Sequence, residues 1–277
     1  GGPTPEERAG FAEIVEIKDC FSADQIEAAA RGLEARHGRL HRITAILELI
    51  QEAVAEARER LGLKGLSKAT AHRFLDKNAM KARLRELGLP CAKHALAESV
   101  EAGLAFARAT GYPLVVKPPV GAGCISTFLI NSEDELRGFL SNANPAPGRA
   151  VQIEEFLKGD EFSFDTITIN GKVLFHSINS YRPTPLDAMR NAWIQWSYVL
   201  PRDISGPEFA EAHRVGVAAA EGLGMVSGVT HMEWFRRPDG SVAIGEVAAR
   251  PPGAHISRAT GMIHGTDFHR AWARAVV

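Results

Sequence analysis

Apolar and polar residues follow two different periods in the first ninety positions of the chain. Residues 13–19 have the alternation of a β-strand, and residues 42–50 fit either a strand or a helix. Helical patterns cover residues 22–38, 51–62 and 67–88, the first of them with Ser22 as a cap. This alternation predicts α/β layering around a parallel sheet. No GxGxxG segment follows an opening strand, so the pattern does not indicate a complete dinucleotide-binding unit.

A denser pattern of short strands and helices begins near residue 99. Helices are predicted over 99–111 and 132–143, and strands over 112–118, 128–130 and 150–157. Residues 161–178 then predict a β-hairpin with Asn170-Gly171 at its tip, because Asn-Gly supplies the positive φ angles of a tight turn. Alternation along its first strand separates two sets of side chains: Glu161, Ser163 and Asp165 on one face, Phe162 and Phe164 on the other.

A second hairpin is predicted over residues 229–250, with Asp239-Gly240 at its tip. In that register Glu233 lies opposite Glu246, His231 opposite Ala248, and Val229 opposite Arg250. Because side chains alternate along a strand, the two carboxylates, the imidazole and the guanidinium share one face. The other face is mostly apolar and can pack on a core.

Glu233 and Glu246 would repel each other in this register. At about 5 Å and an effective dielectric near 20, two full charges repel by roughly 3 kcal/mol. A proton, a cation or wide exposure to water would relieve the repulsion. A solvated hairpin face is one interpretation, and a Mg²⁺ ion between the carboxylates is the other, since Mg²⁺ prefers carboxylate and phosphate oxygens.

Composition narrows the class of protein. The 277 residues are 45% hydrophobic with a net charge of −1, which argues against nucleic acid as a partner because no basic excess is available to neutralise phosphates. No membrane span or signal peptide is visible. The three cysteines form no CxxC pair, which favours a reducing, cytoplasmic location. The chain starts without methionine and stops inside a helical pattern, so we expect the natural protein to be longer.

A phosphate-binding loop is one interpretation of the residues after the strand at 112–118. Lys117 ends this strand, and Gly121, Gly123 and Ser126 follow in a loop that reaches Thr127. Glycines let backbone N–H groups approach an anion, while the lysine adds a positive charge. The loop lacks the GK[ST] ending of a P-loop, and a tight turn with a surface lysine is the simpler alternative.

Two other segments contain candidate residues. The strand at 150–157 ends in Glu154, Glu155, Phe156 and Leu157, whose backbone groups could pair with an adenine edge if they are not simply solvated. Lys77 lies within the helix at 67–88, where a surface lysine is the simpler interpretation.

The order of these segments resembles the ATP-grasp superfamily over residues 68–265. The resemblance is carried by "RFLDKNAMKARLRELGLP", "GYPLVVKPPVGAGCIST", "IEEFLKGDEFSFD" and "GVTHMEWFRRPDGSVAIGEVAARPPG". It implies an α/β (α+β) protein with the ATP-grasp fold. The expected parts are a truncated Rossmann-like domain at 1–92, a lid subdomain at 93–157, and an antiparallel-sheet core with the metal and substrate site at 158–277.

The resemblance also implies a nucleotide site. Lys77 and Lys117 would bind the phosphates of ATP, and the loop at 121–127, with Gly121, Gly123 and Ser126, would close over them. Glu154, Glu155, Phe156 and Leu157 would line the adenine, with the backbone of Glu154 and Phe156 as the expected contacts. Glu161 would hold the ribose hydroxyls.

Metal and catalytic roles follow from the same resemblance. Glu233 and Glu246 would hold Mg²⁺, or Mn²⁺ in its place, and Arg250 would contact an acyl phosphate or the substrate. Many members of the superfamily have E-x-N-x-R where this chain has Glu246, Ala248 and Arg250. Ala248 has no ligand atom, so a second metal ion would need water or another residue.

Within the superfamily, "GVTHMEW" and "ARPPGAHI" are most similar to ligases that join a carboxylate to an amine through an acyl phosphate. The alternatives are a carboxylase or synthetase acting on bicarbonate or formate, and an ATP-binding module without catalysis. The expected partners are a small carboxylate and an amine, with a homodimer left open and no membrane contact.

Substrate contacts are expected from two places near this site. Residues 179–203 form either a polar and aromatic wall or a packed crossover, with Arg182, Arg190, Trp193, Trp196 and Tyr198 as the candidates. His255, Arg258 and His264 follow the second glutamate and are further candidates, although a structural role is simpler for each.

Overall fold

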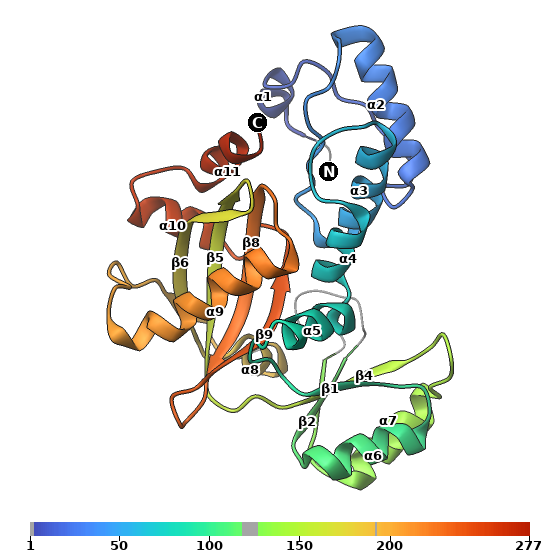
Figure 1. Ribbon diagram of the computed structural model, residues 1–277, viewed down its shortest axis with the longest axis vertical. Coiled ribbons are helices and arrows are strands. Elements are labelled where there is room, and N and C mark those ends of the chain that lie inside the picture. The colour runs from blue at the N-terminus through green and yellow to red at the C-terminus, as the bar shows by residue number, and fades with distance from the viewer. Residues whose placement is uncertain (1–2, 118–126, 192) are drawn as a thin grey trace.

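Two antiparallel sheets form the frame of the protein in this computed structural model, which describes residues 3–117, 127–191 and 193–277 (Figure 1). The smaller sheet has the strand order β1-β4-β2-β3, and the larger has the order β7-β6-β5-β8-β9. The strands of the smaller sheet are β1 (His94–Ala97), β2 (Leu114–Lys117), β3 (Phe128–Ile130) and β4 (Val151–Glu155). The strands of the larger sheet are β5 (Asp160–Ile169), β6 (Lys172–Arg182), β7 (Ser197–Val199), β8 (Gly228–Arg236) and β9 (Val242–Ala248). This mixed helix and antiparallel-sheet architecture confirms the α+β class.

Helices precede, connect and cover the two sheets. The N-terminal region contains α1 (Pro5–Ala9), α2 (Ala23–His37), the 3₁₀ helix η1 (Glu48–Ile50), α3 (Gln51–Arg60), α4 (Lys68–Leu75) and α5 (Lys77–Glu86). The rest of the chain contains α6 (Val100–Thr110), α7 (Glu133–Ala143), α8 (Pro185–Arg190), α9 (Pro207–Leu223), α10 (Ile256–Ile263) and α11 (Phe268–Val276). Within the described residues, no helix is long and apolar enough to cross a membrane.

The smaller sheet is covered by α6 and α7, which lie side by side at one end of the molecule (Figure 1). Ser99 and Ser132 cap these two helices by accepting backbone N–H bonds. Apolar residues of both helices, including Leu104 and Leu136, pack on Ile153 of the central strand β4. This layer has its own hydrophobic core.

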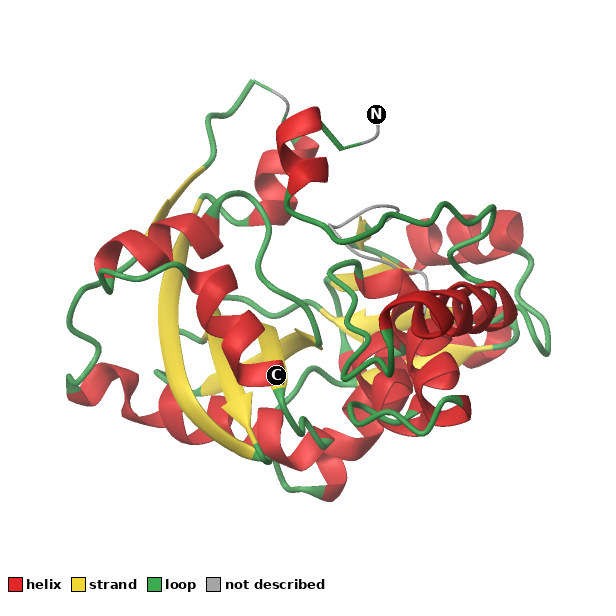
Figure 2. Cartoon of the chain, turned by 90° about the horizontal axis from the view of Figure 1, so that it is seen from above, coloured by secondary structure: helices red, strands yellow, loops and turns green. Residues whose placement is uncertain are grey.

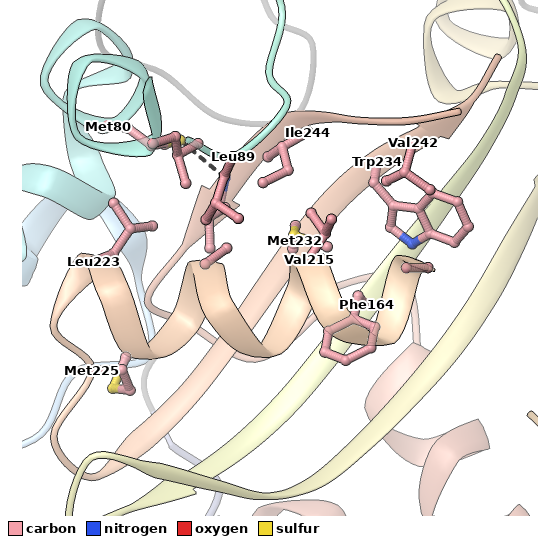
Figure 3. Close-up of a cluster of buried hydrophobic side chains, with 14 of the residues drawn as sticks. Met80, Leu89, Phe164, Val215, Leu223, Met225, Met232, Trp234, Val242 and Ile244 are labelled. Carbon is pink, nitrogen blue, oxygen red and sulfur yellow. Dashed lines mark hydrogen bonds between the residues drawn. The ribbon is translucent and has the colours of Figure 1, made fainter. Parts of the chain in front are cut away.

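The larger sheet is strongly curved (Figure 2) and packs one face against α9 (Figure 3). Phe164 and Trp234 point into this core from β5 and β8, while Val215 comes from α9. The Asn170-Gly171 hairpin is confirmed: both residues have positive φ, and Ile169 pairs with Lys172 on either side of the tip. Because side chains alternate along each strand, the pairing of β5 with β6 fixes which side chains point away from α9, on the other face of the sheet.

The parallel sheet predicted for the first ninety residues is absent from residues 3–93, which contain helices but no strand. Residues 13–19 form no strand, and Ile14 and Val15 are exposed, so the strand predicted there is wrong. Their apolar alternation suits a strand, but a strand also needs a partner to satisfy its backbone. Residues 42–50 are irregular up to the short helix η1.

The helix predicted over 67–88 is divided into α4 and α5 at Asp76. Asp76 has an extended backbone, and its carboxylate accepts the N–H of Ala79 as the N-cap of α5. Aspartate favours caps over helix interiors because its side chain competes for backbone N–H groups. Lys77 is consequently the first residue of α5, facing the space between the two sheets.

Close packing of α9 on the sheet yields a stability prediction. A β-carbon at Gly216 would lie 2.5 Å from a ring carbon of Phe164. We expect Gly216→Ala to destabilise the protein by about 1–3 kcal/mol, because overpacking displaces the ring. Urea unfolding followed by circular dichroism measures this change.

Gly138→Ala is the matched control, since Gly138 lies in α7 and a β-carbon added there would meet no neighbouring atom within 4 Å. It should be neutral or stabilising by up to about 1 kcal/mol, because alanine favours helices. Equal stabilities for the two variants would contradict the packing described for Phe164.

Candidate functional site

A cavity of about 300 Å³ lies between the two sheets and the start of α5. Its walls come from α5, from β2 and β4 of the smaller sheet, and from β5, β8 and β9 of the larger one. The predicted site residues that line it are Lys77, Lys117, Glu154, Glu155, Phe156, Leu157, Glu161, Glu233, Glu246 and Arg250. Residues from most of the chain therefore meet in one space.

The opposed carboxylates have the predicted pairing: Glu233 lies opposite Glu246, and His231 lies opposite Ala248. The predicted two-residue tip is wrong, because β8 ends at Arg236 and β9 begins at Val242. A register shift beside Glu233 leaves Gly245 as an extra residue and restores the pairing. The bulge compensates for the longer turn, so both acids face the cavity.

Each of the two predicted phosphate-binding lysines has an acidic partner. Lys77 Nζ lies 3.1 Å from Glu246 Oε1, and Lys117 Nζ lies 3.0 Å from Glu154 Oε2. Burial opposes the charge on Lys117, but Glu154 and Glu246 outweigh it and raise the pKa of the lysine. Both ammonium groups are thus held beside the cavity by carboxylates.

Glu154 lies in the middle of the smaller sheet, where the backbone of β4 pairs it with His94 of β1 on one side and with Val115 of β2 on the other. Its buried side chain binds Lys117 and also Lys81. Burial would raise the pKa of Glu154, but the two lysines lower it to about 2. The side chain of Glu154 is therefore an ionised partner for two lysines.

Backbone N–H groups at the end of β4 also make hydrogen bonds within the protein. Phe156 N–H donates to the carbonyl of Pro113 at 3.3 Å, and Glu155 N–H donates to the carbonyl of Lys93. An adenine that contacts Phe156 N–H would have to replace or share that bond. Leu157 N–H has no hydrogen bond among the described residues, which makes it the freer donor of this segment.

Lys81 is a site residue that the sequence reasoning missed. It is fully buried, and its Nζ also donates to the Gly245 carbonyl at 2.9 Å. Burial lowers its pKa, although Glu154 opposes this. The available signal was the spacing of Lys77, Met80, Lys81 and Leu84, which places both lysines on the buried face of α5.

His231 connects the cavity to a buried polar group. Its Nδ1 lies 2.6 Å from Asp165, and its Nε2 lies 3.8 Å from Glu233. Burial would lower the pKa of His231, but Asp165 and Glu233 raise it to about 9. The imidazole is therefore cationic at neutral pH, and it holds the pKa of Glu233 low.

Glu161 faces the same cavity under different electrostatic conditions. Burial and the nearby Glu233 and Asp187 raise its pKa well above the ordinary range. Asp187, with Thr184 and Leu186, lines the cavity from the α8 region. These residues belong to the segment 179–203 that was expected near the substrate, but they were not among its named candidates.

Several predicted residues lie elsewhere. Arg182, His255 and Arg258 are exposed and do not line the cavity. The wall predicted from Arg190, Trp193, Trp196 and Tyr198 is likewise absent from the lining. Trp196 instead stacks on Tyr181 and Tyr198 packs beside it, whereas Trp193 is exposed. Gly121, Gly123 and Ser126 lie outside the described residues, and Thr127 lines the cavity.

The residues that line the cavity fit a hard cation whose remaining ligands are water and phosphate oxygens. Among the described residues, no group of three or more His, Cys, Asp or Glu side chains is arranged to hold a metal alone. Glu233 and Glu246 supply two carboxylates on one face, and Ala248 supplies none. Mg²⁺ usually takes one or two carboxylates and completes its shell with water and phosphate oxygens.

The Asp165–His231 pair predicts a pH dependence of stability. A raised pKa stabilises the folded state fully below the unfolded value near 6.5, and this stabilisation is lost as pH rises through about 9. We expect up to about 3 kcal/mol of unfolding free energy to be lost across that window. Asp165→Asn should remove most of this loss, as measured by urea unfolding at several pH values.

Ser163→Ala is the control for this experiment. It removes the hydroxyl that donates to Asp165 at 2.9 Å but leaves the charge on the carboxylate. The pH dependence should persist in this variant. An unchanged pH dependence in Asp165→Asn would refute the pairing.

Comparison with known sequences identifies a matching family and several relatives. The sequence profile of the ATP-grasp domain matches residues 82–257. An L-arginine-specific L-amino acid ligase of Bacillus subtilis is 32% identical over 206 residues, which cover 73% of this chain and 49% of that protein. A formate-dependent phosphoribosylglycinamide formyltransferase of Anaeromyxobacter dehalogenans is 28% identical over 257 residues, covering 90% and 62% of the two chains. The chain spans about half the length of the first of these relatives.

The fold has solved counterparts as well. The crystal structure of an L-amino acid ligase from Bacillus licheniformis superposes with a TM-score of 0.70 at 22% identity, over 92% of this chain and 60% of that one. At this identity the likeness concerns the fold. Since the domain profile covers more than half of the sequence, the chain belongs to the ATP-grasp family.

Proposed function

We propose that this chain forms the ATP- and metal-binding part of a ligase that activates a carboxylate as an acyl phosphate and couples it to an amine. The observation that carries the proposal is the meeting of two lysines, an arginine and a pair of opposed glutamates in one cavity. The similarity to an L-arginine-specific L-amino acid ligase supports an amino acid as one substrate.

The reaction is a phosphoryl transfer followed by acyl transfer. A carboxylate oxygen attacks the γ-phosphorus of ATP and ADP leaves, and the amine then attacks the acyl carbon and displaces phosphate. Carboxylate and triphosphate repel each other, so positioning and charge neutralisation supply most of the rate enhancement. No enzyme nucleophile is required.

Lys77 and Lys117 provide the neutralising charge for the phosphates. Their partners Glu246 and Glu154 keep both ammonium groups in place before the nucleotide binds. Such prearranged charges cost little reorganisation during the reaction. Arg250 provides a further positive charge at the cavity wall for the acyl phosphate or the substrate carboxylate.

Glu233 and Glu246 would hold Mg²⁺, which neutralises phosphate charge and polarises the transferred group when it is bound. His231 keeps Glu233 ionised, and Lys77 orients Glu246 from the other side. The absence of a ligand atom at Ala248 favours a site completed by water and phosphate.

The nucleoside end of ATP would lie toward the segment that joins the two sheets. We assign adenine to residues 154–157 and the ribose hydroxyls to Glu161, which line the cavity together. In this proposal, residues 93–157 act as a lid over a core formed by 158–277.

A second function is favoured by one of the relatives. The formyltransferase from Anaeromyxobacter dehalogenans is named as formate-dependent and matches 90% of this chain. The same charges would serve phosphorylation of formate or bicarbonate, because both are small carboxylate-like anions. The two functions differ in whether an amine is needed for product formation.

An ADP-release assay distinguishes these functions. We expect Mg-ATP turnover with L-amino acids, accompanied by an amide product that mass spectrometry detects. Turnover that depends on bicarbonate or formate and needs no amine would reject the ligase. A thermal shift with Mg-ATP but no acyl phosphate in single-turnover assays would instead indicate a nucleotide-binding module without catalysis.

The metal assignment predicts that Glu246→Ala lowers kcat/KM by about 100-fold or more, since the bound ion is worth several kcal/mol to the transition state. Glu208→Ala, at an exposed acid in the first turn of α9, is the control and should keep full activity. Full activity in Glu246→Ala would refute the assignment. Circular dichroism checks that both variants fold.

A further inference from the structure

A carboxylate from the N-terminal region binds the arginine at the cavity wall. Glu48 Oε2 accepts a hydrogen bond from Arg250 Nε at 2.8 Å, and the two residues are 202 positions apart. Glu48 is only 5% exposed. It lies outside residues 82–257, which match the ATP-grasp domain.

The backbone that carries Glu48 is held by buried polar side chains. Gln51 donates its side-chain amide to the Ala45 carbonyl at 3.0 Å. Arg58 donates to the carbonyls of Ile43 and Leu66, both at 2.9 Å. These bonds fix the segment on both sides of η1, so the Glu48 carboxylate has a defined position.

The hydrogen bonds of Arg250 define the orientation of its guanidinium. Nε is bound by Glu48, and one Nη1 hydrogen bond reaches the Pro251 carbonyl at 3.2 Å. Within the described part of the chain, Nη2 makes no hydrogen bond, and Arg250 lines the cavity. A planar guanidinium held at one edge presents its other edge to an anion.

The environment of Glu48 is unfavourable for an acid with a purely structural role. Burial and the nearby Glu246 raise its pKa, while Arg250 and Lys77 oppose the rise. Its Oε1 is buried without a hydrogen-bond partner among the described residues. Apolar residues of similar volume often replace buried ion pairs without loss of stability, so stability alone gives little reason for this pair.

We propose that Glu48 is a positioning residue that orients Arg250 toward the anionic group transferred or attacked in the cavity. The proposal rests on the ligase function above. It makes the N-terminal region part of the catalytic apparatus, because a residue outside the matched ATP-grasp segment then orients an arginine within it.

Three variants separate positioning from a structural role. Glu48→Gln removes the charge at nearly constant size, and Glu48→Met replaces it with an apolar side chain. Glu52→Gln is the matched control, because Glu52 lies one turn away in an exposed pair with His72. We expect kcat/KM for carboxylate-dependent ADP release to fall by about 10- to 100-fold in both Glu48 variants, as for a misoriented catalytic group. The control should retain full activity.

Combining the Glu48 variants with Arg250→Ala tests whether Glu48 acts through Arg250. If Glu48 acts through Arg250, Glu48→Gln should cause little further loss when Arg250 is already absent. Losses that multiply in the double variant would overturn the proposal. So would a Glu48→Met protein with wild-type kcat/KM, because the pair would then serve packing alone.

A measurement without turnover separates this proposal from the proposed function. In the wild type, the Arg250 Nε–H signal in ¹⁵N NMR should exchange slowly with water, because that proton is buried in the bond to Glu48. The signal should be lost to fast exchange in Glu48→Met, which has no acceptor oxygen, but not in Glu52→Gln. Slow exchange in Glu48→Met would overturn the orientation by Glu48, whereas a wild type without ADP release would contradict only the ligase.

Discussion

The buried carboxylate of Glu154 is the interaction on which the arrangement of the cavity depends. It binds Lys117 at the end of β2 and Lys81 of α5, and Lys81 also reaches the Gly245 carbonyl in β9. Glu154 therefore joins the smaller sheet to α5, and its partner Lys81 connects both to the larger sheet. Removing one partner of a buried pair leaves an uncompensated charge, so the three elements are held in a fixed relation.

The other charged groups of the cavity also occur in opposite pairs, and the paired side chains still line the cavity. Lys77 and Glu246 face each other from α5 and β9, while His231 balances Glu233 beside it. The site is nearly neutral as a whole but has strong local fields. In the proposed function, a triphosphate and a cation would each meet countercharges that are already in position.

The fold of the sheets was largely predictable from local sequence patterns, and the N-terminal region was not. Asn170-Gly171 fixes its hairpin by backbone preference, and Ser99 and Ser132 mark helix starts by their hydroxyls. Those effects act within a few residues. The strand predicted at 13–19 failed because pairing needs a partner that alternation cannot reveal, and the single helix at 67–88 failed because Asp76 is a better cap than interior residue.

The sequence by itself determined the order of the charged segments, and the strand period of two separated Glu233 and Glu246 from the buried Met232 and Val247. The direct opposition of the two acids also depends on the bulge at Gly245, which compensates for the longer turn. Only the tertiary structure decided that Lys81 is buried against Glu154 and that Glu48 binds Arg250. Those pairs join residues 73 and 202 positions apart. Contacts at such separations depend on how whole elements pack, and no local pattern records them.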